Sequence, residues 1–289
     1  MKNIANIKDQ YFMDDPRESE RLIRKVNAHE FVSNYLKKHI DSLEGGKILE
    51  AGCGPGAFLQ IIGDNYPNNT ITGIDLSYSR TADANTKLFA LRNAKAICAN
   101  IYELPFPDDH FDLIYSRFLF EYLKYPEIAA KELFRVCKPG GKLLLQDLDS
   151  QFTFYPALSP KITRVLQTLK EHTGFDPDIG RKLFSIARSG GFTVADTETE
   201  IYHNVFGQID KFNYDLWKLK LDIALENRES MLGNNLEELK AEILESLRNE
   251  SSVMFSFLFT ITAVKKRLNY NLNKVEILES QKLLLNQNH

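Results

Sequence analysis

The chain has 289 residues, which is enough for one large domain or two small ones. Apolar residues make up 43% of it and supply a sizeable core, while a charged share of 26% is ordinary for a soluble protein. The formal net charge of −3 gives no basic footprint for DNA or RNA, so we expect no nucleic-acid partner.

Cysteine usage and hydropathy indicate a reducing compartment and no membrane. The three cysteines are odd in number, scattered and without metal-ligand spacing. Residues 1–13 are too polar for the apolar part of a signal peptide, and the apolar-rich stretch 253–264 is too short to span a bilayer. No pair of the six histidines has metal-ligand spacing either. We therefore expect a cytoplasmic protein with no metal and no membrane contact.

The N-terminal region predicts a short arm followed by a helical cap. Residues 1–16 are polar, with an aromatic pair that includes Tyr11. Between residues 18 and 43 apolar positions recur every three or four residues, which is typical of an amphipathic helix. We expect that helix to break near Asn27 and to end at Gly45 and Gly46. Residues 1–45 form the predicted arm and cap.

Residues 47–75 have the pattern of a nucleotide-binding βαβ unit. A short apolar run ends on Glu50, a glycine-rich turn follows at 52–56, and an apolar helical segment follows the turn. A second predicted strand at 71–74 ends on Asp75. Strand, glycine turn, helix, strand and acid bind an adenosine-bearing cofactor at the carboxyl ends of the strands.

The two acids of this unit bear on which cofactor binds. Asp75 can accept hydrogen bonds from both hydroxyls of an unphosphorylated ribose. Gly52, Gly54 and Ala57 also satisfy the dinucleotide pattern G-x-G-x-x-G/A, so an NAD site is an alternative. Glu50 favours a ligand with an ammonium or sulfonium group, because a carboxylate there would repel a pyrophosphate.

The following residues alternate between helix and strand. Predicted helices at 77–90 and 126–137 alternate with predicted strands at 95–99, 111–116 and 142–146. Helices at 158–169 and 180–189 and strands at 192–203 and 253–265 complete the pattern. Regular alternation of this kind implies a doubly wound, mostly parallel α/β sheet. We place this core at residues 46–206.

About 45 residues separate the last two predicted strands, too many for a hairpin loop. Leucine and isoleucine spacing predicts a helix over 232–247, preceded by Phe212, Tyr214 and Trp217. This insertion, residues 207–250, is either a lid over the substrate side or a dimerisation arm. Residues 251–289 hold the last strand and a polar tail.

Three motifs resemble the class I, seven-stranded methyltransferases that use S-adenosylmethionine (SAM). E-A-G-C-G-P-G at 50–56 resembles their first motif, A-N-I at 99–101 with the acidic segment 103–112 resembles the next, and R-V-C-K-P-G-G-K-L at 135–143 resembles the turn before their fifth strand. The resemblance covers residues 45–150. It implies a seven-stranded sheet whose last two strands form an antiparallel edge pair, with an N-terminal helical cap. The residue spacing described above adds a helical insertion before the last strand.

The resemblance also implies SAM as cofactor and S-adenosylhomocysteine as product. Asn100, where relatives usually carry Asp, would contact the adenine amine, and Leu76 would pack on the adenine ring. Arg117 would contact the methionine part or else pair with an acid such as Glu121. The full set of implied cofactor residues is Glu50, Gly52, Cys53, Gly54, Gly56, Asp75, Leu76, Asn100, Ile101, Ser116 and Arg117.

A general base, where the acceptor needs one, belongs at the carboxyl ends of strands four and five. Tyr122 occupies the position where many relatives carry a histidine, and tyrosine is a poor base near neutral pH. The catalytic candidates are Tyr122, Asp149, His172 and His203, and the substrate candidates are Tyr11, Asp147 and Trp217. Each has an alternative structural role in packing, capping or a surface ion pair, and so does Arg21.

The sequence therefore predicts SAM-dependent methyl transfer to a small-molecule acceptor, with oxygen ranked before nitrogen and carbon. An NAD-dependent oxidoreductase and a non-catalytic SAM-binding subunit are the alternatives. A homodimer is compatible with the insertion. We expect Asp75→Ala to weaken SAM binding by about 1–3 kcal/mol, because a charged acceptor is lost from the ribose.

Overall fold

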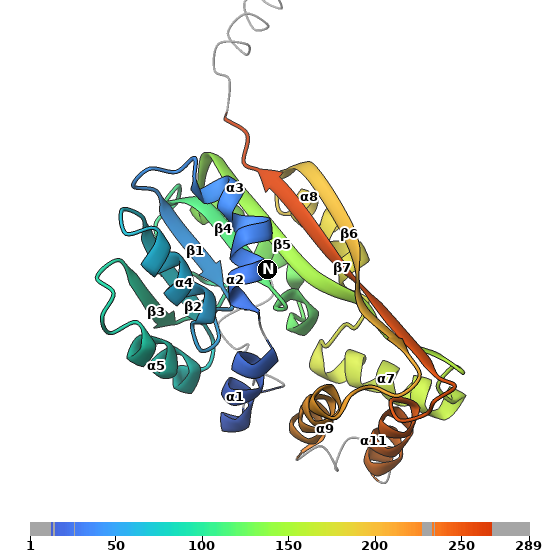
Figure 1. Ribbon diagram of the computed structural model, residues 1–289. Coiled ribbons are helices and arrows are strands. Elements are labelled where there is room, and N and C mark those ends of the chain that lie inside the picture. Colours follow the sequence, from blue (N-terminus) through green and yellow to red (C-terminus); the bar gives the residue numbers. More distant parts are fainter. Residues whose placement is uncertain (1–12, 14, 26, 227–232, 234, 268–289) are drawn as a thin grey trace, which may run out of the picture.

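A computed structural model of the chain describes residues 13, 15–25, 27–226, 233 and 235–267. Tyr11 and the tail after residue 267 lie outside these residues. The described strands form one sheet in the order β3-β2-β1-β4-β5-β7-β6 (Figure 1). Their bounds are β1 Lys47–Ala51, β2 Thr70–Asp75, β3 Ala94–Cys98, β4 Phe111–Arg117, β5 Cys137–Tyr155, β6 Thr193–Phe206 and β7 Val253–Val264.

Pairing in the sheet confirms the predicted architecture. Strands β1 to β5 pair in parallel, whereas β7 pairs antiparallel with both β5 and β6. The last two strands therefore form the expected antiparallel pair at one edge. Successive residues of a parallel strand point to opposite faces of the sheet. Both faces are apolar, because helices cover each of them.

Helices cover both faces of the parallel part. One face holds α2 Ala28–Phe31, the π-helical turn η2 Val32–Leu36, α3 Lys37–Ile40, α4 Ala57–Asn65 and α5 Tyr78–Lys87. The other holds α6 Pro126–Val136 and α8 Leu183–Ser189, with the 3₁₀ turns η3 Phe120–Tyr122 and η4 Gly180–Lys182 nearby. In β5, Leu144 packs in the first layer while Leu143 and Leu145 pack in the second. This alternation fixes the register of the sheet between its two helical layers.

The N-terminal region forms two helical pieces, and the predicted break at Asn27 is confirmed. Helix α1 spans Pro16–Lys25, and α2 begins after Asn27, whose side chain accepts a hydrogen bond from the backbone N–H of Glu30 at 3.2 Å. That bond satisfies one of the unpaired donors at the start of a helix. The break lets α1 turn away from the layer formed by α2, η2 and α3.

Strand β5 is much longer than the predicted 142–146. It runs from Cys137 to Tyr155 and stays paired with β7 as far as the Tyr155–Val253 pair. In Figure 1 the long ends of β5, β6 and β7 extend beyond the parallel sheet toward a separate group of helices. These are α7 Pro160–Thr173, α9 Lys211–Leu225 and α11 Asn235–Ser246. They enclose an additional apolar core.

The insertion contains two described helices where one was expected. The predicted helix at 232–247 corresponds to α11, but Phe212, Tyr214 and Trp217 lie in α9 rather than in a connecting segment. Asp210 caps α9 by accepting a hydrogen bond from the backbone N–H of Asn213 at 2.9 Å. Buried Trp217 and Leu221 then anchor α9 in the additional core.

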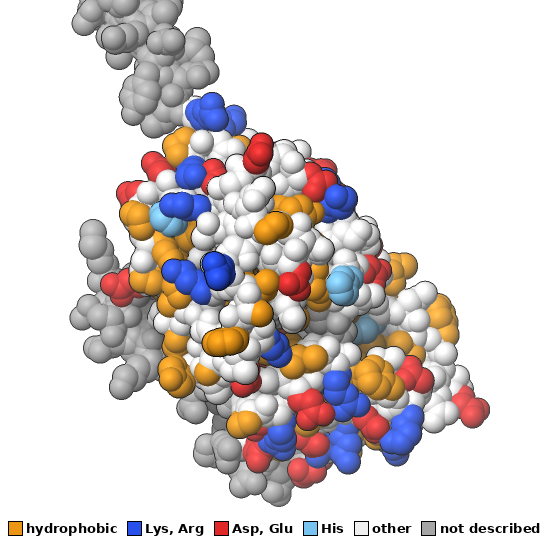
Figure 2. Space-filling view, turned by 60° about the vertical axis from the view of Figure 1, so that its left-hand side comes forward, with side chains coloured by type: hydrophobic (Ala, Val, Ile, Leu, Met, Phe, Trp, Pro, Cys, Tyr) orange, Lys and Arg blue, Asp and Glu red, His pale blue; other side chains and the backbone are white. Residues whose placement is uncertain are grey.

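Charges are mixed on the molecular face drawn in Figure 2, where basic and acidic side chains are interspersed. None of the described helices is long and apolar enough to cross a membrane. The expectations of no nucleic-acid partner and a cytoplasmic location remain predictions.

Candidate functional site

The glycine turn after β1 is held against the end of β2. The backbone N–H groups of Gly52 and Cys53 both donate to the carbonyl oxygen of Ile74, each at 2.8 Å. Gly52 has φ of +80°, and a Cβ there would come within 3.1 Å of the Leu119 side chain. Only glycine fits this conformation and this spacing without strain. The turn therefore leaves room for a ligand to approach its backbone.

Glu50 places a buried carboxyl group beside this turn. Its side chain is 3% exposed, and its Oε2 atom has no hydrogen-bond partner among the described residues. Burial raises the pKa of Glu50 well above its usual value, although the nearby Tyr115 hydroxyl acts in the opposite direction. A buried carboxyl oxygen without a partner is costly unless a ligand supplies one. This position is therefore suited to a cationic donor.

Asp75 ends β2 on the other side of the turn. Its two carboxylate oxygens accept hydrogen bonds from the backbone N–H groups of Gly54 and Ser77, both at 2.9 Å. Since a carboxylate has about four acceptor positions, it can also bind two ribose hydroxyls. The next side chain, Leu76, is 46% exposed and offers an apolar surface to a flat ring.

One cavity brings most of the predicted cofactor residues together. It lies at the carboxyl ends of β1, β2 and β4, where ligands bind in open α/β sheets. The predicted residues that line it are Glu50, Gly52, Cys53, Gly54, Asp75, Leu76, Asn100, Ile101 and Arg117. Burial raises the pKa of the Cys53 thiol well above its usual value, in keeping with a small packing residue rather than a reactive one.

Gly56 and Ser116 are the predicted cofactor residues that do not line this cavity. Gly56 precedes α4 with φ of +77° and packs against α5, where a Cβ would come within 2.8 Å of Ala84. The Ser116 hydroxyl is buried and donates to the carbonyl oxygen of Ala51 at 3.0 Å. Both residues support the turn rather than face the cavity.

Asn100 and Arg117 are each tied to neighbouring groups. The Asn100 side-chain oxygen accepts the backbone N–H of Tyr102 at 3.0 Å. Arg117 donates through Nε to Gln146 Oε1 at 2.7 Å, and its guanidinium lies 4.1 Å from the Phe118 ring centroid. Burial lowers the pKa of Arg117. The sequence offered an acid such as Glu121 as a possible partner for Arg117. In the structure the contacts just described join Arg117 to an amide and an aromatic ring.

The far end of the cavity is lined by residues outside the cofactor motifs. Tyr122 lines it, as the sequence predicted for the segment after β4, and so do Glu121, Thr173 of α7 and Lys220 of α9. Glu121 is buried, and one of its carboxyl oxygens accepts a hydrogen bond from the Gln151 amide. Lys220 donates to the side-chain oxygen of the same Gln151 at 3.1 Å. This end of the cavity therefore carries one carboxyl group, one ammonium group and the hydroxyl-bearing residues Tyr122 and Thr173.

Helix α1 covers the cavity with a buried ion pair. Arg21 donates to both carboxylate oxygens of Glu18, at 2.6 and 2.7 Å, and both residues line the cavity. The side chains are only 4% and 1% exposed. The alternative of a surface ion pair for Arg21 is therefore wrong, because both side chains of the pair are buried.

The two acids of β5 serve the structure in this conformation. Asp149 is buried and forms an ion pair with Arg181, and its Oδ2 accepts the backbone N–H of Arg181 at 2.8 Å. Asp147 accepts the backbone N–H groups of Leu148 and Glu121, at 2.8 and 3.1 Å. Burial and the charge of Glu121 raise the pKa of Asp147 well above its usual value. Neither acid lines the cavity among the residues that the structure describes.

The other catalytic and substrate candidates also lie elsewhere. His172 is exposed on α7, with Nδ1 at 2.9 Å from the carbonyl oxygen of Thr168. His203 lies on β6 with Nδ1 at 2.7 Å from the Ser256 hydroxyl, and Trp217 is buried in the additional core. Among the described residues none of these three lines the cavity. The described residues contain no cluster of His, Cys, Asp or Glu able to hold a metal.

Comparison with known proteins agrees with this geometry. Residues 49–145 match the family described as a methyltransferase domain. A malonyl-[acyl-carrier protein] O-methyltransferase of Erwinia billingiae is 36% identical over 116 residues, which cover 40% of this chain and 44% of that protein. The chain spans about half the length of the curated relatives it matches, between 37% and 52% of them.

Solved structures show the same fold. A SAM-dependent methyltransferase from Aquifex aeolicus superimposes with a TM-score of 0.51 at 16% identity, over 86% of this chain and 97% of that one. The Haemonchus contortus phospholethanolamine N-methyltransferase 2, solved with phosphomonomethylethanolamine and S-adenosylhomocysteine, gives a TM-score of 0.54 at 18% identity. That match covers 83% of this chain and 53% of the other.

The fold, the glycine turn and the matching domain place residues 49–145 in the class I SAM-dependent methyltransferases. The cofactor of this domain is SAM. The residues present suit SAM, because the unpartnered oxygen of Glu50 can accept from a cationic group and Asp75 can accept from an unphosphorylated ribose.

The hydrogen bonds of Asp75 change what its removal should do. Because Asp75 also holds the N–H groups of Gly54 and Ser77, we expect Asp75→Ala to loosen the glycine turn as well as the ribose contact. SAM affinity should fall about 5- to 150-fold by calorimetry, and Asp75→Asn, which keeps one acceptor, should lose less. Equal affinity in wild type and Asp75→Ala would reject the ribose role.

Proposed function

We propose that the chain is a cytoplasmic enzyme that transfers the methyl group of SAM to a small-molecule acceptor. The observation that carries this proposal is one cavity with two chemically different ends. Glu50 and Asp75 lie at the cofactor end, and Glu121, Tyr122 and Lys220 lie at the other. Residues of α1 and α9 also line the cavity, and we infer that these helices restrict it to a small acceptor rather than an extended polymer.

Bound SAM supplies a methyl group on a positively charged sulfur, a leaving group that needs little further activation. The protein's task is then alignment and exclusion of water. Leu119 and Phe58 provide apolar wall along the cavity, and the buried Glu18–Arg21 pair closes it on the α1 side. These groups hold an acceptor in a dry environment.

Glu121 is the group best placed to take a proton from the acceptor. It follows β4, lines the cavity, and is oriented by the Gln151 amide and by the hydrogen bond from its own N–H to Asp147. A carboxylate held in this way can accept the proton of a hydroxyl or amine as the methyl bond forms. We rank oxygen first as the acceptor atom, then nitrogen, then carbon.

We further propose that residues 207–250 act as a lid rather than as a dimerisation arm. Lys220 of this segment lines the cavity, and α9 meets α1 through the Arg17–Glu226 ion pair and the Arg24 guanidinium, 5.3 Å from the Phe212 ring centroid. A segment that lines a site and contacts the helix covering the other side of that site is typical of a lid. A homodimer is still an expectation of the sequence alone.

Two measurements test the proposed function. Calorimetry should show binding of SAM and S-adenosylhomocysteine and no binding of NAD at millimolar concentration. Labelled-methyl transfer to a panel of phenols, carboxylates and amines should then yield a labelled product. Binding of SAM without transfer to any acceptor would support the alternative of a non-catalytic SAM-binding subunit.

A further inference from the structure

A second, smaller cavity adjoins the first beneath the insertion. It lies between α7, α9 and α11 and has a volume of about 20 Å³. Leucine, isoleucine and alanine side chains of these helices line it together with Phe152 and Phe175. Two residues, Tyr122 and Lys220, line both cavities. The second cavity is therefore next to the acceptor end of the first and not at the cofactor end.

The two shared residues separate a polar region from an apolar one. The Tyr122 ring centroid lies 5.7 Å from that of Phe175, so the tyrosine ring forms part of the apolar wall. Lys220 places Nζ 5.3 Å from the Trp217 ring centroid while donating to Gln151, which in turn donates to Glu121. Apart from Tyr122 and Lys220, the second cavity has only apolar lining residues.

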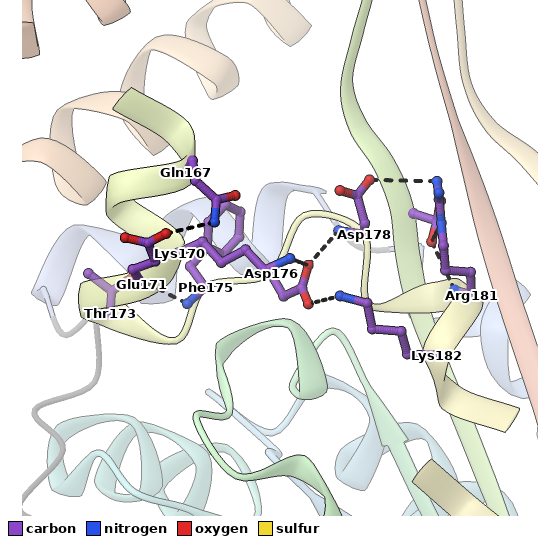
Figure 3. Close-up of polar contacts among 10 residues, drawn as sticks. Gln167, Lys170, Glu171, Thr173, Phe175, Asp176, Asp178, Arg181 and Lys182 are labelled. Carbon is purple, nitrogen blue, oxygen red and sulfur yellow. Dashed lines mark hydrogen bonds and ion pairs between the residues drawn. The ribbon is translucent and has the colours of Figure 1, made fainter. Parts of the chain in front are cut away.

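The wall of the second cavity is anchored by an ion-pair cluster shown in Figure 3. Asp176 lies between Lys170 of α7, whose Nζ is 2.9 Å away, and Lys182 of η4. Its own backbone N–H donates to the carbonyl oxygen of Glu121 at 2.7 Å. Although burial acts to raise it, the pKa of Asp176 is lowered by these two lysines. Phe175, which lines the second cavity, directly precedes Asp176 in the chain.

An apolar cavity of this kind favours an alkyl group over water. A water molecule needs two to four polar partners, and the lining residues beyond Tyr122 and Lys220 supply none from their side chains. We propose that the second cavity binds a short alkyl end of the methyl acceptor, whose reacting polar group lies beside Glu121. The volume of about 20 Å³ holds roughly one water-sized group, so the cavity admits the terminal methyl end of such a chain. This inference rests on the proposed function, because it describes the acceptor of the same site.

Homologous series of small probes test the inference. Binding of n-alkanoic acids, n-alkanols and n-alkylamines with two to eight carbons is measured by calorimetry on protein loaded with S-adenosylhomocysteine. In at least one series, affinity should rise about fourfold for each added methylene, the gain expected for burying one such group, and then level off. Affinity that is independent of chain length in all three series would overturn the inference.

Two variants that change the cavity in opposite directions make the test specific. Ala224→Phe should fill the cavity and abolish the dependence on chain length, whereas Leu239→Ala should enlarge it and move the plateau to longer chains. The matched control Ala241→Phe, at an exposed position of α11, should behave as wild type. Loss of the chain-length effect in Ala241→Phe, or its persistence in Ala224→Phe, would contradict the assignment.

The same samples separate this inference from the proposed function. If SAM binds and a methyl group is transferred but chain length has no effect, only the alkyl site is wrong. If the protein binds SAM but transfers no methyl group to any acceptor, the proposed function fails. Chain-length-dependent binding of the probes in that case would still mark the second cavity as a ligand site.

Discussion

Glu121→Gln should reduce methyl transfer about 10²- to 10⁴-fold while leaving SAM affinity within twofold of wild type. Glutamine keeps the size of the side chain and can still accept from the Gln151 amide, so the cavity wall should stay in place. It cannot accept a proton from the acceptor. The measurement is single-turnover transfer of labelled methyl with SAM at saturation, which reports on the reaction rather than on cofactor binding.

Glu127→Gln is the matched control, because Glu127 is exposed on α6 and is not among the residues that line the cavity. It should transfer methyl at the wild-type rate. A Glu121→Gln rate within threefold of wild type would show that the acceptor loses its proton by another route or has none to lose. In that event Tyr122 would be the next residue to substitute, since it alone of the sequence-based catalytic candidates lines the cavity.

Local patterns explain why the cofactor half could be predicted from the sequence. Glycines at 52–56, an acid before them and an acid after β2 lie within 26 residues of one another, and the βαβ unit brings them together without help from the rest of the chain. Nine of the eleven predicted cofactor residues accordingly line one cavity. The other two, Gly56 and Ser116, support the glycine turn from outside the cavity.

Distant contacts explain why the acceptor half could not be predicted. The sequence makes Asp149 a catalytic candidate, because its ion-pair partner, Arg181, lies 32 residues further along the chain and no local pattern reveals the pairing. Lys220 carries no motif and reaches the cavity only because α9 packs against the long ends of β5 to β7. The sequence predicts strand β5 only over 142–146, whereas pairing with β7 extends it to Tyr155. The strand character of this extension depends on a partner about 100 residues away.

From the sequence, Glu121 is predicted only as a possible ion-pair partner of Arg117, although its position also indicates a site. A charged residue following the apolar residues 118–120 at the end of a predicted strand is unusual, because burying it carries a cost that packing alone does not repay. In the structure the Gln151 amide donates a hydrogen bond to the buried Glu121 carboxyl group, which offsets part of that cost. An acid in such a segment is a signal for a site.

Glu50→Gln should have opposite effects on the free protein and on the complex with SAM. In the free protein, burial raises the pKa of Glu50, so the folded state binds a proton more tightly than the unfolded chain does. The contribution of Glu50 to stability is therefore complete below the unfolded value and is lost as pH rises through the folded pKa. Glutamine does not ionise, and Glu50→Gln should be more stable than wild type at neutral pH by about 1–3 kcal/mol.

The affinity for SAM should rise with pH, whereas the stability of the free protein should fall. A cationic ligand favours the ionised carboxylate, so wild-type SAM affinity should increase as pH rises from the usual carboxyl range toward the raised pKa of Glu50. Glu50→Gln should bind SAM at least tenfold more weakly at pH 8 and should lack this increase. Thermal unfolding of the free protein and calorimetry with SAM, each from pH 5 to pH 8, measure the two effects, with Glu44→Gln at an exposed position as the control. A variant that is less stable than wild type at pH 8 and binds SAM equally well would contradict a cation-binding role for Glu50.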